Sequence, residues 1–327
     1  MSEWNRHARA RTRGVVINPE DLSFREWPER AKEAGLTTIA LHDSRAGATI
    51  APILEREEGQ RFLEGCQRLG LAVEYELHAV CDLLPRSLFE TNPELFRMND
   101  AGERTPDANL CVHSEQALEI VAEAAVRVAK TLRPTTGRYF YWGDDAAPAC
   151  HCPRCRDLTP ADQALLVENR ILAALRTLDP HATLAHLTYA YTLIPPSQVR
   201  PAPGLFLEFA PGGLHCIEKV EGDASLGTTD RSVKERYFEL LDANLEIFDA
   251  GQAQVLEYWL DVSAFAGWRK PVTRALDWER RRPAFALDLE AYRSRGIQQF
   301  TTFACYADAD YVSAFGELPL AEYASAL

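Results

Sequence analysis

Two adjacent carboxylates follow an aromatic run near the middle of the chain. The run Tyr139–Trp142 (YFYW) is followed by Gly143 and then by Asp144 and Asp145. Two acids held close together separate their pKa values, so that one is ionised while the other stays protonated. Cleavage of a glycosidic bond uses two such carboxyl groups, one as acid and one as base or stabiliser. We therefore predict that Asp144 and Asp145 are catalytic.

A second acidic segment, VLEYWLDVSAFAGW, covers residues 255–268. Glu257, Trp259 and Asp261 share one face of an extended strand, and we expect this face to line the active site. Carboxylates bind sugar hydroxyls, and an indole ring stacks on a pyranose. Glu257 is thus a further catalytic candidate, and Trp259, Asp261 and Glu208 (in LFLEF) are candidates for substrate binding. The alternative for each acid is a structural ion pair with an Arg or Lys.

Other polar and aromatic residues end β-rich runs and are predicted to contact the substrate. They are His42, Trp142, Tyr189 and Tyr191. A histidine at a strand end is also often a satisfied structural residue, and the sequence leaves both readings open for His42.

Three cysteines lie close together just after the acidic pair. Cys150, Cys152 and Cys155 have the spacing C-x-C-x-x-C, and their thiolates could bind a structural zinc ion with a fourth ligand such as Cys111 or His113. The alternative is that the thiols only shape the loop. Catalysis is predicted to need no cofactor.

Eight β-rich runs alternate with segments of helical periodicity. The runs are 15–18, 37–42, 72–80, 138–145, 183–191, 205–211, 254–262 and 298–306. Strict alternation predicts a parallel sheet, and eight strands close a (β/α)8 TIM barrel, in which active sites lie at the C-terminal ends of the strands. A doubly wound sheet would place a Gly-rich phosphate turn after its first strand, where this chain has Asn18-Pro19 instead. The long connection 81–113, between the third strand and its helix, is expected to lie over the active face.

Composition limits the class of protein. The 327 residues are 46% hydrophobic, and we expect one domain over residues 1–327. The net charge of −13 disfavours nucleic acid and anionic membranes as partners. The sequence shows no apolar membrane span and no signal-peptide pattern, which predicts a cytoplasmic protein. The oligomeric state is not predicted.

The stretch YFYWGDDAAPACHCPRCRDL and the segments after it resemble a known family. The shared marks are the acidic strand end, the C-x-C-x-x-C loop, a helix with Asn169, a strand that ends in tyrosine before Pro195-Pro196, and a sixth strand with Glu208. Over about residues 105–311 the chain is similar to the domain of unknown function 4838, also classified as glycoside hydrolase family 163.

The resemblance implies retaining hydrolysis of a β-linked N-acetylglucosaminide, which known members cleave within N-glycans. The Asp-Asp pair also resembles the dyads of families 84 and 20, in which the acetamide of the substrate attacks the anomeric carbon. By this resemblance Asp144 would polarise the acetamide and Asp145 would be the general acid. Because the family motif often has a single Asp, the equivalent residue stays open. With no export signal or accessory domain seen, a small glycoside or oligosaccharide is the expected substrate.

Three alternatives remain from the sequence. A conventional retaining glycosidase would use Glu257 as nucleophile and Asp145 as acid, with their carboxyl groups about 5–5.5 Å apart. A non-catalytic carbohydrate-binding barrel would bind sugars without cleaving them. A zinc-dependent hydrolase or lyase would use the cysteine cluster.

Overall fold

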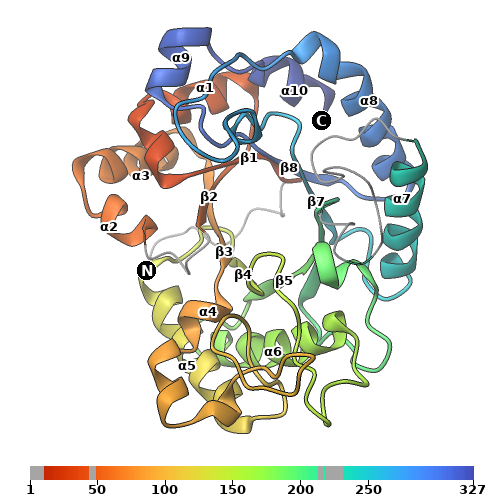
Figure 1. The fold of residues 1–327 in the computed structure, drawn as a ribbon. Coiled ribbons are helices and arrows are strands. Elements are labelled where there is room, and N and C mark those ends of the chain that lie inside the picture. The colour runs from red at the N-terminus through yellow and green to blue at the C-terminus, as the bar shows by residue number, and fades with distance from the viewer. Residues whose placement is uncertain (1–10, 44–48, 213–216, 218–230) are drawn as a thin grey trace.

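Eight parallel strands form a closed barrel in the order β1 to β8. The computed structural model describes residues 11–43, 49–212, 217 and 231–327. Figure 1 looks along the barrel axis. The predicted (β/α)8 barrel is confirmed. The strands are β1 (Arg13–Ile17), β2 (Thr38–Asp43), β3 (Ala72–His78), β4 (Arg138–Trp142), β5 (Thr183–Thr188), β6 (Leu205–Phe209), β7 (Gln254–Glu257) and β8 (Gln299–Phe303).

Helices surround the barrel and cover the outer faces of the strands (Figure 1). They are α1 (Trp27–Ala34), α2 (Ile50–Leu54), α3 (Glu57–Leu69), α4 (Val80–Leu83), α5 (Glu115–Thr131), α6 (Pro160–Leu175), α7 (Arg231–Leu245), α8 (Trp278–Ser294), α9 (Ala309–Phe315) and α10 (Leu320–Ala326). None of these described helices is long and apolar enough to cross a bilayer.

The start of α6 shows how local sequence fixes the rim of the barrel. Thr159 accepts a hydrogen bond from the Asp162 backbone N–H, and the Asp162 side chain accepts one from the Thr159 N–H. Pro160 occupies the first turn, where a missing N–H costs nothing. The helix therefore begins at a defined point after the cysteine-containing loop.

The core has two parts, one inside the barrel and one between the strands and the helices. Alternate residues of each strand point inward or outward. The inner cluster includes Phe140 and Trp142 of β4, Phe206 of β6 and Leu256 of β7. The outer cluster joins the other strand faces to the helices. Because strands are buried on both faces, burial alone does not reveal which residues face the lumen.

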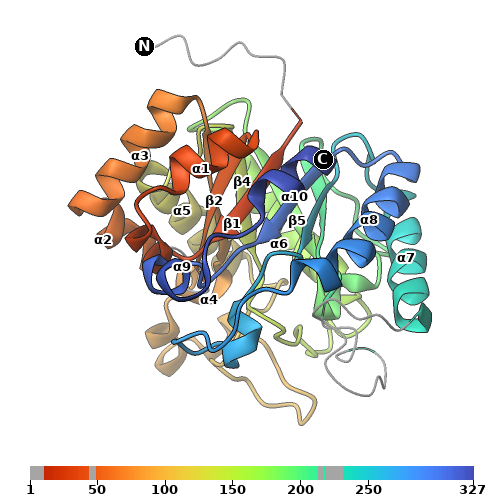
Figure 2. The ribbon, with the colours of Figure 1, turned by 90° about the horizontal axis from the view of Figure 1, so that it is seen from above.

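The loops after the strands gather at one end of the barrel. In Figure 2 this end lies at the bottom, with α4 and the loops after β3 and β7. The connection after β3 contains α4 and two short 3-10 helices, Arg86–Glu90 and Pro93–Leu95, before α5 begins. This connection lies at the C-terminal end of the barrel.

Candidate active site

Aromatic rings from several strands line the C-terminal mouth of the barrel. The His78 and Trp142 ring centroids are 5.0 Å apart, those of His42 and Phe303 5.3 Å, and those of Tyr258 and Phe303 4.9 Å. His78 also lies 6.5 Å from the Tyr189 ring. We call this set the mouth cluster: His42, His78, Trp142, Tyr189, Tyr258 and Phe303. Such a surface suits the apolar face of a sugar ring.

Asp145 lies at the edge of the mouth cluster. Its Oδ1 is 3.7 Å from His78 Nε2, and its side chain is 59% exposed. Burial raises the pKa of the Tyr258 hydroxyl, and the negative charge of Asp145 adds to this rise. The Asp145 carboxylate therefore faces the mouth from the end of β4 while it stays open to solvent.

His42 is a neutral group in this cluster. Burial, followed by the charge of His78, lowers the pKa of His42 to about 4. Its Nδ1–H donates a hydrogen bond to the Glu76 carbonyl at 3.0 Å, which leaves Nε2 as an acceptor. A neutral His42 can accept a hydrogen bond from a sugar hydroxyl or an amide N–H.

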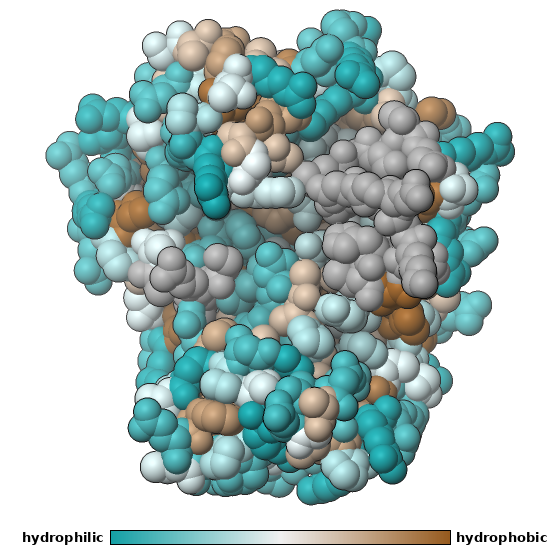
Figure 3. Space-filling model, in the orientation of Figure 1, coloured by the Kyte–Doolittle hydropathy of each residue, from teal (hydrophilic) through white to brown (hydrophobic). Residues whose placement is uncertain are grey.

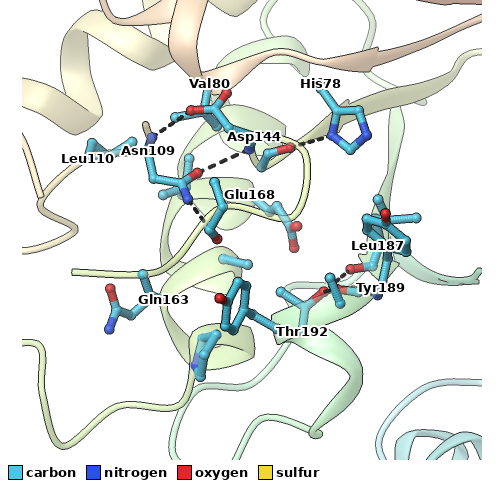
Figure 4. A pocket seen from close by; sticks show the side chains of 18 of the residues that line it. His78, Val80, Asn109, Leu110, Asp144, Gln163, Glu168, Leu187, Tyr189 and Thr192 are labelled. Carbon is cyan, nitrogen blue, oxygen red and sulfur yellow. Dashed lines mark hydrogen bonds between the residues drawn. The ribbon is translucent and has the colours of Figure 1, made fainter. Parts of the chain in front are cut away.

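Asp144 holds the loop after β3 through both of its carboxylate oxygens. Its Oδ1 accepts the Cys81 backbone N–H at 2.7 Å, and its Oδ2 accepts the Asn109 N–H at 2.5 Å. Asn109 in turn accepts the Asp144 N–H through Oδ1 at 3.1 Å (Figure 4). The Asn109 amide donates to the Pro148 carbonyl at 3.0 Å. Because both Asp144 oxygens already have backbone donors, the geometry favours a positioning role over polarisation of a substrate.

A cavity of about 80 Å³ opens beside the mouth, between the loops after β4 and β5 and the helix α6. Figure 4 shows His78 and Tyr189 on one side of it, with Glu168 and Gln163 deeper toward α6. Tyr191, predicted to bind substrate, also lines this cavity. The cavity has room for a small substituent.

The surface at this end of the barrel is mostly hydrophilic, and hydrophobic residues appear in small separate groups (Figure 3). Its centre, over the barrel axis, is recessed. The recess agrees with a small-molecule site in the mouth rather than with a broad apolar docking surface.

Glu208 lies deeper in the barrel and has no exposed surface. It accepts hydrogen bonds from Trp142 Nε1 at 2.8 Å and from Gln254 Nε2 at 2.9 Å. Burial raises the pKa of Glu208 to about 8. The structure therefore places Glu208, which is predicted to bind substrate, beneath the Trp142 indole. Its hydrogen bond to Trp142 positions this ring in the mouth cluster.

The prediction that Glu257 and Trp259 face the active site is wrong. Glu257 accepts a 2.6 Å hydrogen bond from the Tyr292 hydroxyl of α8, and the Trp259 ring packs against Phe285 of the same helix at 4.8 Å. Both side chains lie outside the barrel wall, and Tyr258 takes the place at the mouth. Both faces of β7 are buried, so polarity does not show which face points into the lumen. The face that carries Glu257 packs against a helix.

The Asp261 carboxylate accepts hydrogen bonds within its own loop. The Ser263 hydroxyl donates to the Asp261 carboxylate, with Oγ 2.9 Å from each of the two oxygens, and Asp261 is 3% exposed. Burial raises the pKa of Asp261. Its position fits a structural role after β7 rather than the predicted contact with substrate.

The buried carboxyl of Glu257 leads to a prediction about pH and stability. Burial, followed by the charge of Asp288, raises the pKa of Glu257 to about 8, against 4.5 for the ordinary group. The folded protein then holds a proton that the unfolded chain loses, so this contribution to stability is full below pH 4.5 and is lost as the pH rises to about 8. Glu257→Gln should flatten the fall in the free energy of unfolding between pH 5 and pH 8, measured by urea denaturation. An unchanged pH profile in the variant would contradict this assignment.

Four cysteines come together beside the site. The three predicted thiols, Cys150, Cys152 and Cys155, lie with Cys111, and their sulfur atoms are all within 4.8 Å of one another. Of the two fourth ligands that the sequence left open, Cys111 is the one in the cluster. This set can hold a metal ion.

The sequence does not predict three residues of the mouth cluster. Tyr258, Phe303 and His78 are not among the predicted site residues, although each lies within one of the predicted β-rich runs. That position was the available signal. The sequence pattern gives acids more weight than rings, and it assigns the inward face of β7 to the wrong residues.

The barrel is similar to solved glycosidase structures at low sequence identity. A β-galactosidase from Rahnella sp. R3 superposes with a TM-score of 0.59 and 12% identity, over 97% of this chain and 56% of that one. A variant of the GH42 β-galactosidase Gan42B from G. stearothermophilus gives a TM-score of 0.57 and 14% identity, over 99% and 58%. The chain thus spans little more than half the length of these two enzymes. At such identities the likeness shows the fold.

A third structure contains the GH20 catalytic modules of a pneumococcal exo-β-D-N-acetylglucosaminidase. It superposes with a TM-score of 0.52 and 10% identity, over 97% of this chain and 84% of that one. No curated protein sequence matches the chain. Residues 35–264, however, match the family described as "Domain of unknown function (DUF4838)". This match covers most of the barrel, including the acidic strand end and the cysteine loop, and the chain therefore belongs to the DUF4838 family.

Proposed function

We propose that this protein is a glycoside hydrolase that cleaves a β-linked N-acetylhexosaminide in a small glycoside or oligosaccharide. The observation that carries the proposal is the position of Asp145 at the edge of the mouth cluster, 3.7 Å from His78 Nε2. A carboxyl group beside an aromatic platform at the C-terminal end of a barrel is suited to protonate a glycosidic oxygen. Family membership and the glycosidase folds of the structural neighbours support it.

The position of the other acids favours catalysis assisted by the substrate's acetamide. Of the five acids that the sequence suggested, Asp144, Glu208, Glu257 and Asp261 already accept hydrogen bonds from protein donors. Glu257, the alternative nucleophile, lies outside the barrel wall. The acetamide of an N-acetylhexosaminide would supply the nucleophile that these side chains do not. The cavity beside His78 and Tyr189 offers space for a group of this size.

In the proposed reaction Asp145 first donates a proton to the leaving oxygen. The acetamide oxygen attacks the anomeric carbon, and the bond to the leaving group breaks with its electron pair. Asp145, now ionised, then accepts a proton from the water that opens the cyclic intermediate, which restores the acid and gives retained configuration. His42 Nε2 would accept a hydrogen bond from the sugar or its amide.

A thiazoline analogue of N-acetylglucosamine tests this mechanism. It resembles the cyclic intermediate and should inhibit competitively, because the site is complementary to that geometry. Aryl N-acetyl-β-glucosaminide should be cleaved at least about 100-fold faster than the matching aryl β-glucoside, which lacks the internal nucleophile. Initial rates of aryl release measure both effects.

Three outcomes would contradict the proposal. Equal rates on the two glycosides with no thiazoline inhibition would support a conventional double displacement instead. Saturable sugar binding without cleavage of any aryl glycoside would indicate a carbohydrate-binding barrel. Release of product with inverted configuration, observed by NMR, would exclude the acetamide-assisted route.

A further inference from the structure

We propose that Cys111, Cys150, Cys152 and Cys155 bind a structural zinc ion that ties the loop after β3 to the loop after β4. Cys111 belongs to the first loop, and the other three belong to the second. This inference does not depend on the glycosidase reaction.

The distances between the sulfur atoms fit a tetrahedral site. Zinc–sulfur bonds of about 2.3 Å in a tetrahedron place the ligand atoms about 3.8 Å apart. Cys111 Sγ lies 3.8 Å from Cys152 Sγ and 3.9 Å from Cys155 Sγ. These separations are far longer than a disulfide bond, and all four cysteines are free thiols.

The surroundings of the cluster suit a charged metal–thiolate centre. The Met98 backbone N–H donates to Cys150 Sγ at 3.3 Å, and an Arg104 guanidinium nitrogen lies 3.8 Å from the same sulfur. Four thiolates around a divalent ion leave a net charge of about −2, which these donors offset. His113, by contrast, donates its Nε2–H to the Arg154 carbonyl at 2.8 Å, so it connects the loops without entering the cluster.

The site is closed, which indicates a structural rather than a catalytic ion. All four cysteines are buried. Four protein ligands fill a tetrahedral shell and leave no position for water or substrate. The zinc-dependent hydrolase or lyase that the sequence left open therefore lacks support in this geometry.

The ion would also stabilise the loop after β4, which carries Asp145. The two loops that it joins are the same two that meet through Asp144 and Asn109. Gln163 of α6 adds hydrogen bonds to the Cys150 and Cys155 carbonyls at 3.0 and 3.2 Å, which links the cluster to the helix. Loss of the metal should loosen residues 81–113 and 143–158 together while the rest of the barrel stays folded.

Elemental analysis of the purified wild-type protein tests the assignment without any substitution. We expect about one zinc ion per chain, released by a mercurial thiol reagent and detected with a zinc-binding dye. Cys111→Ser should lower the zinc content at least about tenfold, whereas the control Cys66→Ala, a buried cysteine away from the cluster, should keep it. Iron in place of zinc, or no metal in the wild type, would overturn the proposal.

Hydrogen exchange tests the proposed link between the loops. On release of the metal, backbone amides of residues 81–113 and 143–158 should exchange at least about tenfold faster, while those of α8 keep their protection. Unchanged exchange in both segments after complete zinc loss would show that the ion does not join them. This readout is independent of enzyme activity, so a failure of the glycosidase proposal would leave it intact.

Discussion

Asp145→Asn is expected to lower kcat on an aryl N-acetyl-β-glucosaminide by about 10²–10⁴-fold, because an amide cannot donate the proton that the leaving oxygen needs. Since the side chain is 59% exposed, the substitution should leave the thermal unfolding midpoint close to that of the wild type. The rate loss should be smallest with leaving groups of low pKa, which depart without protonation. Steady-state kinetics over a series of aryl leaving groups measures this dependence.

Two matched substitutions separate catalysis from structure. Glu257→Gln changes an acid that faces α8, outside the barrel wall. The activity of this variant should stay near that of the wild type. Asp144→Asn weakens the acceptor of two backbone N–H groups and should lower stability by about 1–3 kcal/mol. If Glu257→Gln lost activity as Asp145→Asn does, the conventional double displacement would replace the acetamide-assisted mechanism, whereas full activity of Asp145→Asn would contradict both mechanisms.

The barrel could be predicted from the sequence because its signals are local. Runs rich in β-branched and aromatic residues alternate with helical periodicity, and both patterns depend on neighbouring residues. The predicted runs extend past the true ends of the strands. The fourth run is predicted at 138–145, whereas β4 ends at Trp142, and the seventh at 254–262, whereas β7 ends at Glu257. In both runs, the residues at the rim have a composition that is typical of a strand. The hydrogen bonds between the strands, however, have already ended there.

The site was harder to predict because it depends on orientation. The position of Asp145 at the end of β4 followed from the fold class, since parallel strands of a barrel end at one rim. The hydrogen bonds that hold Asp144 come from Cys81 and Asn109, which lie in a long connection whose path has no periodic signal. The fourth cysteine, Cys111, comes from the same connection. Local spacing suggested the three ligands within six residues, and only tertiary structure selects Cys111 over His113.

The lumen below the mouth contains a buried polar network that composition did not reveal. Glu74 and Glu76 of β3 are fully buried, and both Glu76 oxygens are without a hydrogen-bond partner among the described residues. Burial, followed by the charges of Glu208 and Glu74, raises the pKa of Glu76, while Arg138 lowers it. The Arg138 guanidinium therefore lies among buried carboxyl groups, of which Glu76 and Glu208 have raised pKa values.

Arg138→Met is expected to lower the free energy of unfolding by about 3–5 kcal/mol, because it removes the cation from a buried network and leaves its partners unpaired. Arg138 Nη2 donates to Gln254 Oε1 at 2.7 Å, Nη1 donates to Thr12 Oγ1 at 2.9 Å, and Nη1 lies 3.5 Å from Glu74 Oε1. The guanidinium also lies 4.5 Å from the Phe206 ring centroid. Urea denaturation at pH 7 measures the loss.

A surface arginine provides the matched control for this effect. Arg170 forms a 2.6 Å ion pair with Glu119, and both side chains are largely exposed, so Arg170→Met should cost less than about 1 kcal/mol. Adding Glu74→Gln to Arg138→Met should recover part of the loss, since the second change removes the acid that has lost its arginine partner. If Arg138→Met were no more costly than Arg170→Met, the buried carboxyl groups would have to be protonated, so that they need no cation beside them. The stability of the barrel would then depend on neutral hydrogen bonding beneath Trp142 rather than on charge balance.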